Sequence, residues 1–315
     1  MKIPSLNTYQ SISEFSPPKQ TIVTLGTFDG VHTGHRKIIS KLVQSAAETG
    51  LESALLTFFP HPRMVLAAES NIQLLNTIDE RAQLLEQIGL QNLIVHPFDK
   101  KFSMLGAEEF VKDILVDGLN IHKIIIGHDH RFGQNRTAGI EELITFGKQY
   151  NFEVEQISAS EIDDVAVSST KIRNALLEGN VALANEFLGY AYFLTGTVIE
   201  GKKLGRTIGF PTANLKISAD YKLIPAKGVY VVKANLHQRE VFGMMNIGTN
   251  PTVDGSALSI ETYFFDFDSD LYGQQIQISI LERIRNEYKF ASIDVLKQQL
   301  HRDQEFSLRY LNNQQ

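Results

Sequence analysis

Cysteine is absent from the 315-residue sequence. Its absence excludes disulfide bonds, thiolate metal sites and a cysteine nucleophile. The sequence also lacks an apolar run of about 18 residues, the length that a membrane-spanning helix needs. The first residues, MKIPSLNTYQSISEF, lack the apolar core of a signal peptide. We therefore expect a cytoplasmic protein without a membrane partner.

An excess of basic residues is also missing. The chain has 30 Lys and Arg against 36 Asp and Glu, which gives a formal net charge of −6. Proteins that bind nucleic acid usually carry a basic footprint, so we expect no nucleic-acid partner. Local basic clusters remain, and these suit a small polyanion.

The composition is that of a globular protein, with 43% hydrophobic and 21% charged residues. A length of 315 residues favours two domains. In the first half, strand-like and helix-like patterns alternate, which predicts an α/β fold with a doubly wound parallel sheet. The predicted strands are Thr21–Gly26, Ala54–Phe59, Asn92–Phe98, His122–Gly127 and Phe152–Ile157. The predicted helices are His35–Glu48, stopped by Gly50, a second opened by a capping box at Thr77–Glu80, and then Gly106–Leu115 and Gly139–Tyr150.

The pattern changes near residue 190 to short β-like runs separated by turn residues. These runs predict an all-β second domain, an antiparallel barrel or sandwich. A closing amphipathic helix is predicted over Ser292–Tyr310. Its apolar residues are Val295, Leu296, Leu300, Phe306 and Leu308. We place the domains at 1–187 and 188–315.

The stretch TLGTFDGVHTGH, Thr24–His35, joins a predicted strand to a predicted helix. Helix N-termini hold phosphate through free N–H groups, and Gly26 and Gly34 allow close approach of the backbone. His32 and His35 face the same way on the first turn and can donate to a polyphosphate. Two alternatives remain: the pair only caps and packs, or it forms a zinc cluster with the 128–130 side chains, His128, Asp129 and His130.

A second phosphate motif is predicted in VSSTKIRNALL, where Ser168, Ser169 and Thr170 end a loop and begin a helix. Lys171 and Arg173 add positive charge. Taken alone, this segment is better explained as an ordinary hydroxyl N-cap with a solvated basic face. Together with HTGH in a doubly wound domain, the phosphate interpretation is favoured.

In the second half, KKLGRTIGFPTANL combines Gly205 and Gly209 with basic residues, as expected of a loop over a polyphosphate. Thr212 and Asn214 then present oxygen ligands on the same side of an extended segment, which suits Mg²⁺. Glu261 lies between apolar neighbours in a predicted strand. If Ile260 points into the core, Glu261 points to the opposite face and is a candidate general base.

The motifs TFDGVHTGH, SSTKIR, TFFPHPRMVL and GHDHRFGQNRTAG resemble the adenylyltransferase module of prokaryotic bifunctional riboflavin kinase/FAD synthetases. The resemblance implies attack of the FMN phosphate on the α-phosphorus of ATP and release of pyrophosphate. It implies ATP or phosphate contacts for His32, His35, Gly26, Phe28, Gly34, Ser168, Ser169, Thr170 and Arg173. It implies flavin-side roles for Phe59, His61, Pro62, Arg63 and Asp129. Thr27 stands where asparagine is frequent, and His130 where phenylalanine is frequent.

The motifs GRTIGFPTAN, GVYVV, NIGTNPTV, ETYFFDFDSDLYG and RIRNEYKF resemble the riboflavin kinase module of the same family. The resemblance implies a Greek-key β-barrel with a terminal helix. It implies Mg²⁺ and ATP contacts for Thr212 and Asn214, with Glu261 as the catalytic base. Further implied contacts are ATP binding by Gly205, Arg206, Gly209 and Pro211 and a flavin-side role for Arg285.

The chain is therefore expected to be a transferase that converts riboflavin to FMN and FMN to FAD, with ATP and Mg²⁺. We expect a monomer or weak homo-oligomer. Two alternatives remain open. One is a single-activity riboflavin kinase with an altered first domain, which the intact HTGH and SSTKIR motifs disfavour. The other is a flavin-responsive regulatory or RNA-binding protein, which the negative charge and the retained candidate base disfavour.

Overall fold

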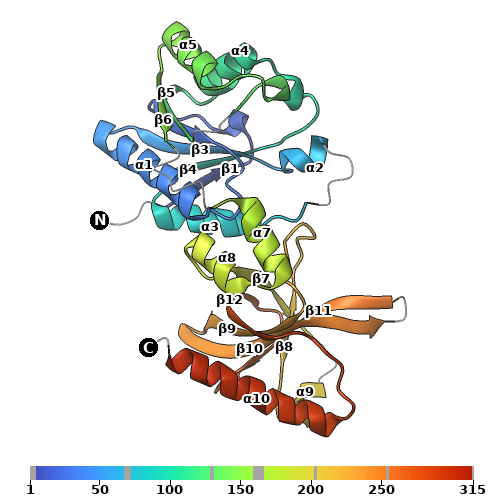
Figure 1. The fold of residues 1–315 in the computed structure, drawn as a ribbon. Helices are drawn as coiled ribbons and strands as arrows, with labels where there is room; N and C mark the ends of the chain where they lie inside the picture. Colours follow the sequence, from blue (N-terminus) through green and yellow to red (C-terminus); the bar gives the residue numbers. More distant parts are fainter. Residues whose placement is uncertain are drawn as a thin grey trace. The chain divides into compact units, whose positions relative to one another are not determined.

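The computed structural model describes residues 5–66, 72–127, 131–158, 167–201, 204–252 and 255–313 (Figure 1). Packing divides the chain into two compact units, Met1–Ser169 and Thr170–Gln315. No helix in the described ranges is both long and apolar enough to cross a membrane.

The first unit contains a six-stranded sheet in the order β1-β4-β3-β2-β5-β6. Every neighbouring pair of strands is parallel. The strands are β1 Asn7–Tyr9, β2 Thr21–Leu25, β3 Glu52–Phe58, β4 Asn92–His96, β5 Ile121–Gly127 and β6 Glu153–Ile157. The predicted α/β class with a doubly wound parallel sheet is thus confirmed. The edge strand β1 was not predicted, since the first strand expected from the sequence begins at Thr21.

Helices connect these strands and cover the sheet. They are η1 Ile12–Glu14, α1 Thr33–Thr49, α2 Pro62–Leu66, α3 Ile78–Ile88, η2 Phe102–Met104, α4 Ala107–Glu109, η3 Phe110–Gly118, η4 Gln134–Arg136 and α5 Ile140–Tyr150. The local signals behave as predicted, since Gly50 ends α1 in the left-handed region at φ 68°. Thr77 and Glu80 form both contacts of the capping box that opens α3.

The side chains of η3 and α5 share one apolar core with β2, β3 and β5. This core includes Val23, Leu56, Val111, Ile124 and Leu143. Helix α1 contacts β2, β3 and β5 through its own buried face. The sheet is therefore buried by helices, as the near-continuous apolar strands require.

The second unit contains a closed barrel in the order β10-β11-β8-β7-β12-β9. All its pairs are antiparallel. Helix α7, Ser169–Glu178, begins at the last residue of the first unit and continues into the second. The further elements of the second unit are α8 Val181–Leu188, β7 Phe193–Ile199, α9 Leu204–Thr207, β8 Ala213–Lys216, β9 Gly228–Leu236, β10 Arg239–Thr252, β11 Gly255–Phe264, β12 Gln275–Arg285 and α10 Ile293–Asn312. Of the two all-β architectures that the sequence left open, the barrel is the one observed.

Helix α10 begins after the N-cap Ser292, close to the predicted start. Its predicted apolar face is partly wrong: Val295 is 46% exposed and Leu308 is 45% exposed. The most buried side chains of the helix are instead Asp303 and Ser307. The helix turns a polar side chain inward because Asp303 has a cationic partner on the barrel, Arg285 on β12.

Candidate active sites

The turn between β2 and α1 has an unusual backbone. Gly30 adopts a φ of 89°, and the non-glycine residues Phe28 and Val31 adopt φ values of 45° and 37°. L side chains rarely occupy this region, and such conformations persist where surrounding contacts hold them, often at functional sites. A Cβ on Gly26 would come within 3.1 Å of the Phe28 ring. A side chain at position 26 would therefore force the Phe28 ring to shift by a few tenths of an ångström.

The two histidines are brought together at the start of α1. Their rings stack with centroids 3.6 Å apart, and Phe28 packs against His35 at 4.8 Å. The Nδ1 atom of His32, the N-cap residue, accepts a hydrogen bond from the His35 backbone N–H at 3.4 Å. Since Nδ1 is an acceptor, the neutral ring carries its hydrogen on Nε2, which makes Nε2 a donor.

Both imidazoles are held in the neutral form. Burial lowers the pKa of His32 to about 4, although the nearby Asp29 carboxylate acts in the opposite direction. Burial also lowers the pKa of His35 well below its usual value, with further lowering from His32 and Arg81. The pair therefore offers hydrogen-bond donors at neutral pH without carrying net charge. Within the described ranges, the buried Nδ1 of His35 has no hydrogen-bond partner.

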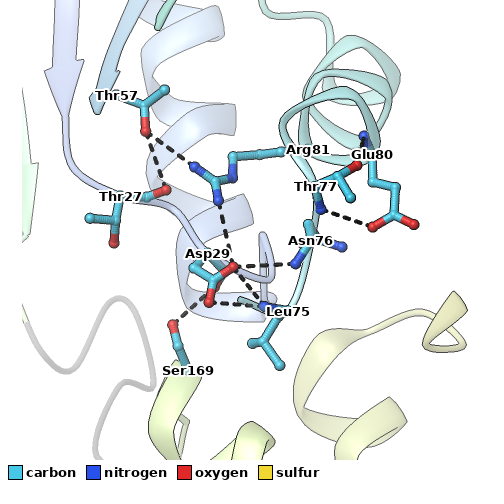
Figure 2. Close-up of polar contacts among 9 residues, drawn as sticks. All are labelled: Thr27, Asp29, Thr57, Leu75, Asn76, Thr77, Glu80, Arg81 and Ser169. Atoms are coloured by element: carbon cyan, nitrogen blue, oxygen red, sulfur yellow. Dashed lines mark hydrogen bonds and ion pairs between the residues drawn. The ribbon is translucent and has the colours of Figure 1, made fainter. Parts of the chain in front are cut away.

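Beneath this turn lies a polar network that sequence reasoning missed (Figure 2). Asp29 and Arg81 are both 1% exposed, with Arg81 Nη2 3.5 Å from Asp29 Oδ1. The Ser169 hydroxyl donates to the Asp29 carbonyl oxygen at 2.9 Å. Asp29 lies within the TFDGVHTGH motif itself, so the motif was the available signal for its importance. Nothing local in the sequence marks Arg81 as its partner.

Of the second phosphate motif, Ser168 and Ser169 are half-buried, and Ser169 opens α7. Thr170 is exposed and Arg173 half-buried, and both belong to the second compact unit. The Ser169 contact with Asp29 brings the beginning of this motif to the histidine turn.

The predicted flavin-side residues follow β3. The half-buried Phe59 donates its backbone N–H to the His96 carbonyl at 3.1 Å. His61 is 8% exposed, and its Nδ1 accepts from the Arg63 backbone N–H at 3.1 Å, at the start of α2. Pro62 is the first residue of α2, a favourable position for proline, and the Arg63 side chain is exposed.

Asp129 lies outside the described residues, as do His128 and His130 of the proposed zinc cluster. Across the described ranges, no three His, Cys, Asp or Glu side chains gather as metal ligands do. The zinc alternative and the His130 departure therefore involve positions to which the structure does not extend.

In the barrel, the candidate base and the candidate magnesium ligands are brought together by strand pairing. Glu261 on β11 lies directly opposite Asn214 on β8. The Thr212 hydroxyl donates to Glu261 Oε2 at 3.2 Å, and the Ser259 hydroxyl to Oε1 at 2.7 Å. Ile260 is 4% exposed while Glu261 is half-buried, so the predicted alternation along β11 is confirmed.

A cavity of about 570 Å³ opens beside Thr212. Its wall combines apolar, aromatic, acidic and basic side chains. The lining residues are Val198, Arg206, Pro211, Thr212, Ala213, Thr262, Phe264, Phe267, Asp268, Ser269, Asp270, Leu271 and Tyr272. The size and the mixed wall suit a nucleotide-sized ligand.

Two glycines shape the loop that leads to Thr212. The Gly205 carbonyl accepts from the Phe210 N–H at 2.8 Å, and a Cβ on Gly205 would collide with the Phe210 carbonyl oxygen. Gly209 adopts a φ of 87°, a conformation that favours glycine. Arg206, between them, has its Nη2 3.5 Å from the Tyr272 hydroxyl.

The two units together define a class, a two-domain enzyme that transfers phosphorus-containing groups between small molecules. A family model for FAD synthetase matches residues 15–171, and one for riboflavin kinase matches residues 188–311. Bifunctional riboflavin kinase/FMN adenylyltransferases from Escherichia coli K12 and Listeria monocytogenes are 36% and 38% identical to this chain. The first alignment covers 92% of both chains, and the second covers 90% of both. The chain belongs to the bifunctional riboflavin kinase/FMN adenylyltransferase family.

A solved structure is also similar over most of the chain. It is described as a macrolide-efflux protein from Streptococcus pneumoniae, with 32% identity and a TM-score of 0.87. The similarity covers 96% of this chain and 98% of the other. The fold of both units thus occurs in an experimentally determined protein.

Proposed function

We propose that the chain phosphorylates riboflavin to FMN with ATP in residues 188–315 and adenylylates FMN to FAD in residues 1–187. The observation that carries this proposal is that Glu261 on β11 lies opposite Asn214 on β8 and accepts a hydrogen bond from Thr212, just before β8. In the other unit, the neutral histidine pair at a strand-to-helix turn supports the second activity. The family membership supports both.

In the kinase reaction, Glu261 would accept the proton of the ribityl 5′-hydroxyl as its oxygen attacks the γ-phosphorus of ATP. The bond from the γ-phosphorus to the ADP oxygen breaks, and ADP leaves. The hydroxyls of Ser259 and Thr212 each donate to one carboxylate oxygen of Glu261. These bonds orient the carboxylate before substrate binds.

The donor set around Glu261 fits Mg²⁺. The Thr212 hydroxyl gives its hydrogen to Glu261, so the lone pairs of its oxygen remain for a hard cation. The amide oxygen of Asn214 is the second expected ligand. Bound Mg²⁺ would neutralise charge on the ATP phosphates. The cavity lined by Arg206, Pro211 and Thr212 would hold ATP, with Gly205 and Gly209 shaping its loop.

In the adenylyl transfer, an oxygen of the FMN phosphate attacks the α-phosphorus of ATP and pyrophosphate leaves. His32 Nε2–H and His35 would donate to the phosphates as charge shifts to the leaving group. The Ser169 hydroxyl donates to the Asp29 carbonyl oxygen, so we expect Ser169 to contact phosphate through its backbone N–H instead. The remaining ATP contacts are assigned to Gly26, Phe28, Gly34, Ser168, Thr170 and Arg173, and the flavin contacts to Phe59, His61, Pro62, Arg63 and Asp129.

A time course tests the proposal. Full-length protein is incubated with riboflavin, ATP and Mg²⁺, and riboflavin, FMN and FAD are separated at intervals while pyrophosphate is measured. We expect FMN to appear first and FAD to follow with one pyrophosphate for each FAD. FMN without pyrophosphate would instead support a single-activity riboflavin kinase. Absence of all turnover, with binding of a specific RNA, would support the regulatory alternative.

The metal requirement, the oligomeric state, the partners and the cellular location are also predictions. We expect both activities to require Mg²⁺ and to survive a zinc-selective chelator. We expect a monomer or weak homo-oligomer without a nucleic-acid partner, which light scattering and a binding assay check. Cell fractionation checks the cytoplasmic location.

A further inference from the structure

One residue of the β2–α1 turn, Asp29, contacts three other segments of the first unit (Figure 2). Its Oδ1 and Oδ2 atoms accept from the Leu75 backbone N–H at 2.9 and 3.1 Å, and Oδ1 accepts from the Asn76 N–H at 3.3 Å. The Arg81 guanidinium on α3 pairs with the same carboxylate, and the Ser169 hydroxyl reaches the Asp29 carbonyl. Asp29 therefore ties the histidine turn to the chain before α3, to α3 and to Ser169.

Arg81 holds the other end of the same turn. Its Nη1 donates to the Thr57 hydroxyl at 3.3 Å, and that hydroxyl donates to the Thr27 carbonyl at 3.3 Å. In Figure 2 the guanidinium lies between Thr57 and Asp29, while the Thr27 side chain points away from the network. The planar, forked guanidinium can serve two partners in fixed directions, which a lysine ammonium cannot reproduce.

The burial of this pair argues for a geometric role. Both side chains are 1% exposed. The cost of removing two charges from water usually cancels most of their attraction, so a buried ion pair adds little net stability. What such a pair can supply is a fixed distance and direction between the two segments that carry it.

The Asp29 carboxylate is buried against groups of the protein, so it is not placed to bind substrate. Its oxygens accept from two backbone N–H groups and face Arg81. Asp29 lies three residues before His32, so a shift of Asp29 moves the cap of α1. A shift also moves the partner of the Ser169 hydroxyl.

We infer that Asp29 and Arg81 are positioning residues for adenylyl transfer, which set the placement of the His32–His35 turn relative to Ser169. The inference rests on the proposed FMN adenylyltransferase activity. Neither residue touches substrate; both act through the groups that do. Since a misplacement of about 1 Å can cost about 10²-fold in rate, loss of either contact acts mainly on kcat.

The test uses full-length Asp29→Asn, Arg81→Met and Arg81→Lys. The matched control is Glu153→Gln, which removes an exposed partner of Lys123 on the same sheet. For each variant, kcat and KM for ATP are measured in FAD formation, below the melting temperature. FMN formation from riboflavin by the same preparation serves as an internal standard of folded enzyme.

We expect Asp29→Asn and Arg81→Met to lower kcat of FAD formation by about 10²-fold, with KM for ATP within about threefold of wild type. Arg81→Lys should restore part of kcat, since it keeps the charge but not the fork. FMN formation should stay within about twofold, and Glu153→Gln should behave as wild type. A lower melting temperature with unchanged kcat per folded molecule would show a purely structural pair and overturn the inference. A raised KM with unchanged kcat would also overturn it.

The double variant Asp29→Asn/Arg81→Met covers the case in which a single variant does not fold, because it leaves no unpaired buried charge. We expect it to fold and to keep the lowered kcat; a wild-type kcat in this variant would refute the positioning role. Wild-type protein that forms no FAD from FMN and ATP would contradict the proposed adenylyltransferase activity itself. The two failures are therefore distinguishable.

Discussion

Arg285 on β12 and Asp303 on α10 form a two-pronged ion pair. Arg285 Nε lies 3.0 Å from both carboxylate oxygens, and Nη2 lies 2.8 Å from Oδ2. The guanidinium also lies over the Tyr288 ring, 4.6 Å from its centroid. The carboxylate accepts a further bond from Gln299 at 2.8 Å. The same arginine that the family resemblance places on the flavin side thus anchors the terminal helix.

This pair predicts that Asp303→Ala strongly destabilises the second unit. Asp303 is 1% exposed, so its removal leaves the Arg285 charge without its carboxylate. Breaking one partner of a buried pair typically lowers the free energy of unfolding by about 3–5 kcal/mol. Urea unfolding measures the loss, and the exposed Glu305→Gln on the same helix should stay within about 0.5 kcal/mol of wild type. An equally small effect of Asp303→Ala would contradict this account of the helix.

Glu261→Gln should separate the two activities. The amide cannot accept the proton of the attacking hydroxyl, so FMN formation from riboflavin should fall by about 10²–10⁴-fold. FAD formation from supplied FMN should continue, because Glu261 lies in the barrel unit. The control is Glu240→Gln, an exposed partner of Lys233 in the same barrel. Full kinase activity in Glu261→Gln would exclude this carboxylate as the base.

His32→Ala should have the opposite effect. Loss of one preorganised donor typically costs about 10²–10³-fold in kcat, here for FAD formation. FMN formation should remain within about twofold, since the histidine turn belongs to the first unit. Product separation over time measures both. If well-folded His32→Ala lost both activities together, the division of labour between the units would be wrong.

The low pKa of His32 predicts acid sensitivity of the first unit. In the unfolded state the His32 imidazole has its usual pKa of 6.5, whereas in the folded state its pKa is about 4. Between these values the unfolded state holds more protons, so the free energy of unfolding falls as the pH drops. One such group contributes at most about 1.4 kcal/mol per pH unit.

Urea unfolding between pH 4 and 7.5 measures this slope. The matched variant is His32→Asn, because asparagine can keep the N-cap of α1 but does not titrate. We expect a shallower slope in the variant, with the remaining part due to His35 and to carboxylates. Identical slopes in the two proteins would exclude His32 as a source of the acid sensitivity.

The sequence by itself determined the features that depend on neighbours a few residues away. The Thr77–Glu80 capping box and the Gly50 stop are set by contacts within one helical turn. The side chains of Glu261 and the buried Ile260 lie on opposite faces of β11, which follows from the two-residue period of a strand. The two sets of motifs, in order along the chain, were enough to identify the family.

The tertiary structure alone decided the features that depend on distant partners. Strand β1 has only three residues and forms because Asn7–Tyr9 pair with β4. Asp303 faces inward, against the apolar pattern of its helix, because Arg285 is there to receive it. The Arg81 guanidinium lies beside Asp29 because α3 packs against α1, the helix that follows the histidine turn. A buried charge needs a partner, and the local pattern of the chain does not specify which distant residue supplies it.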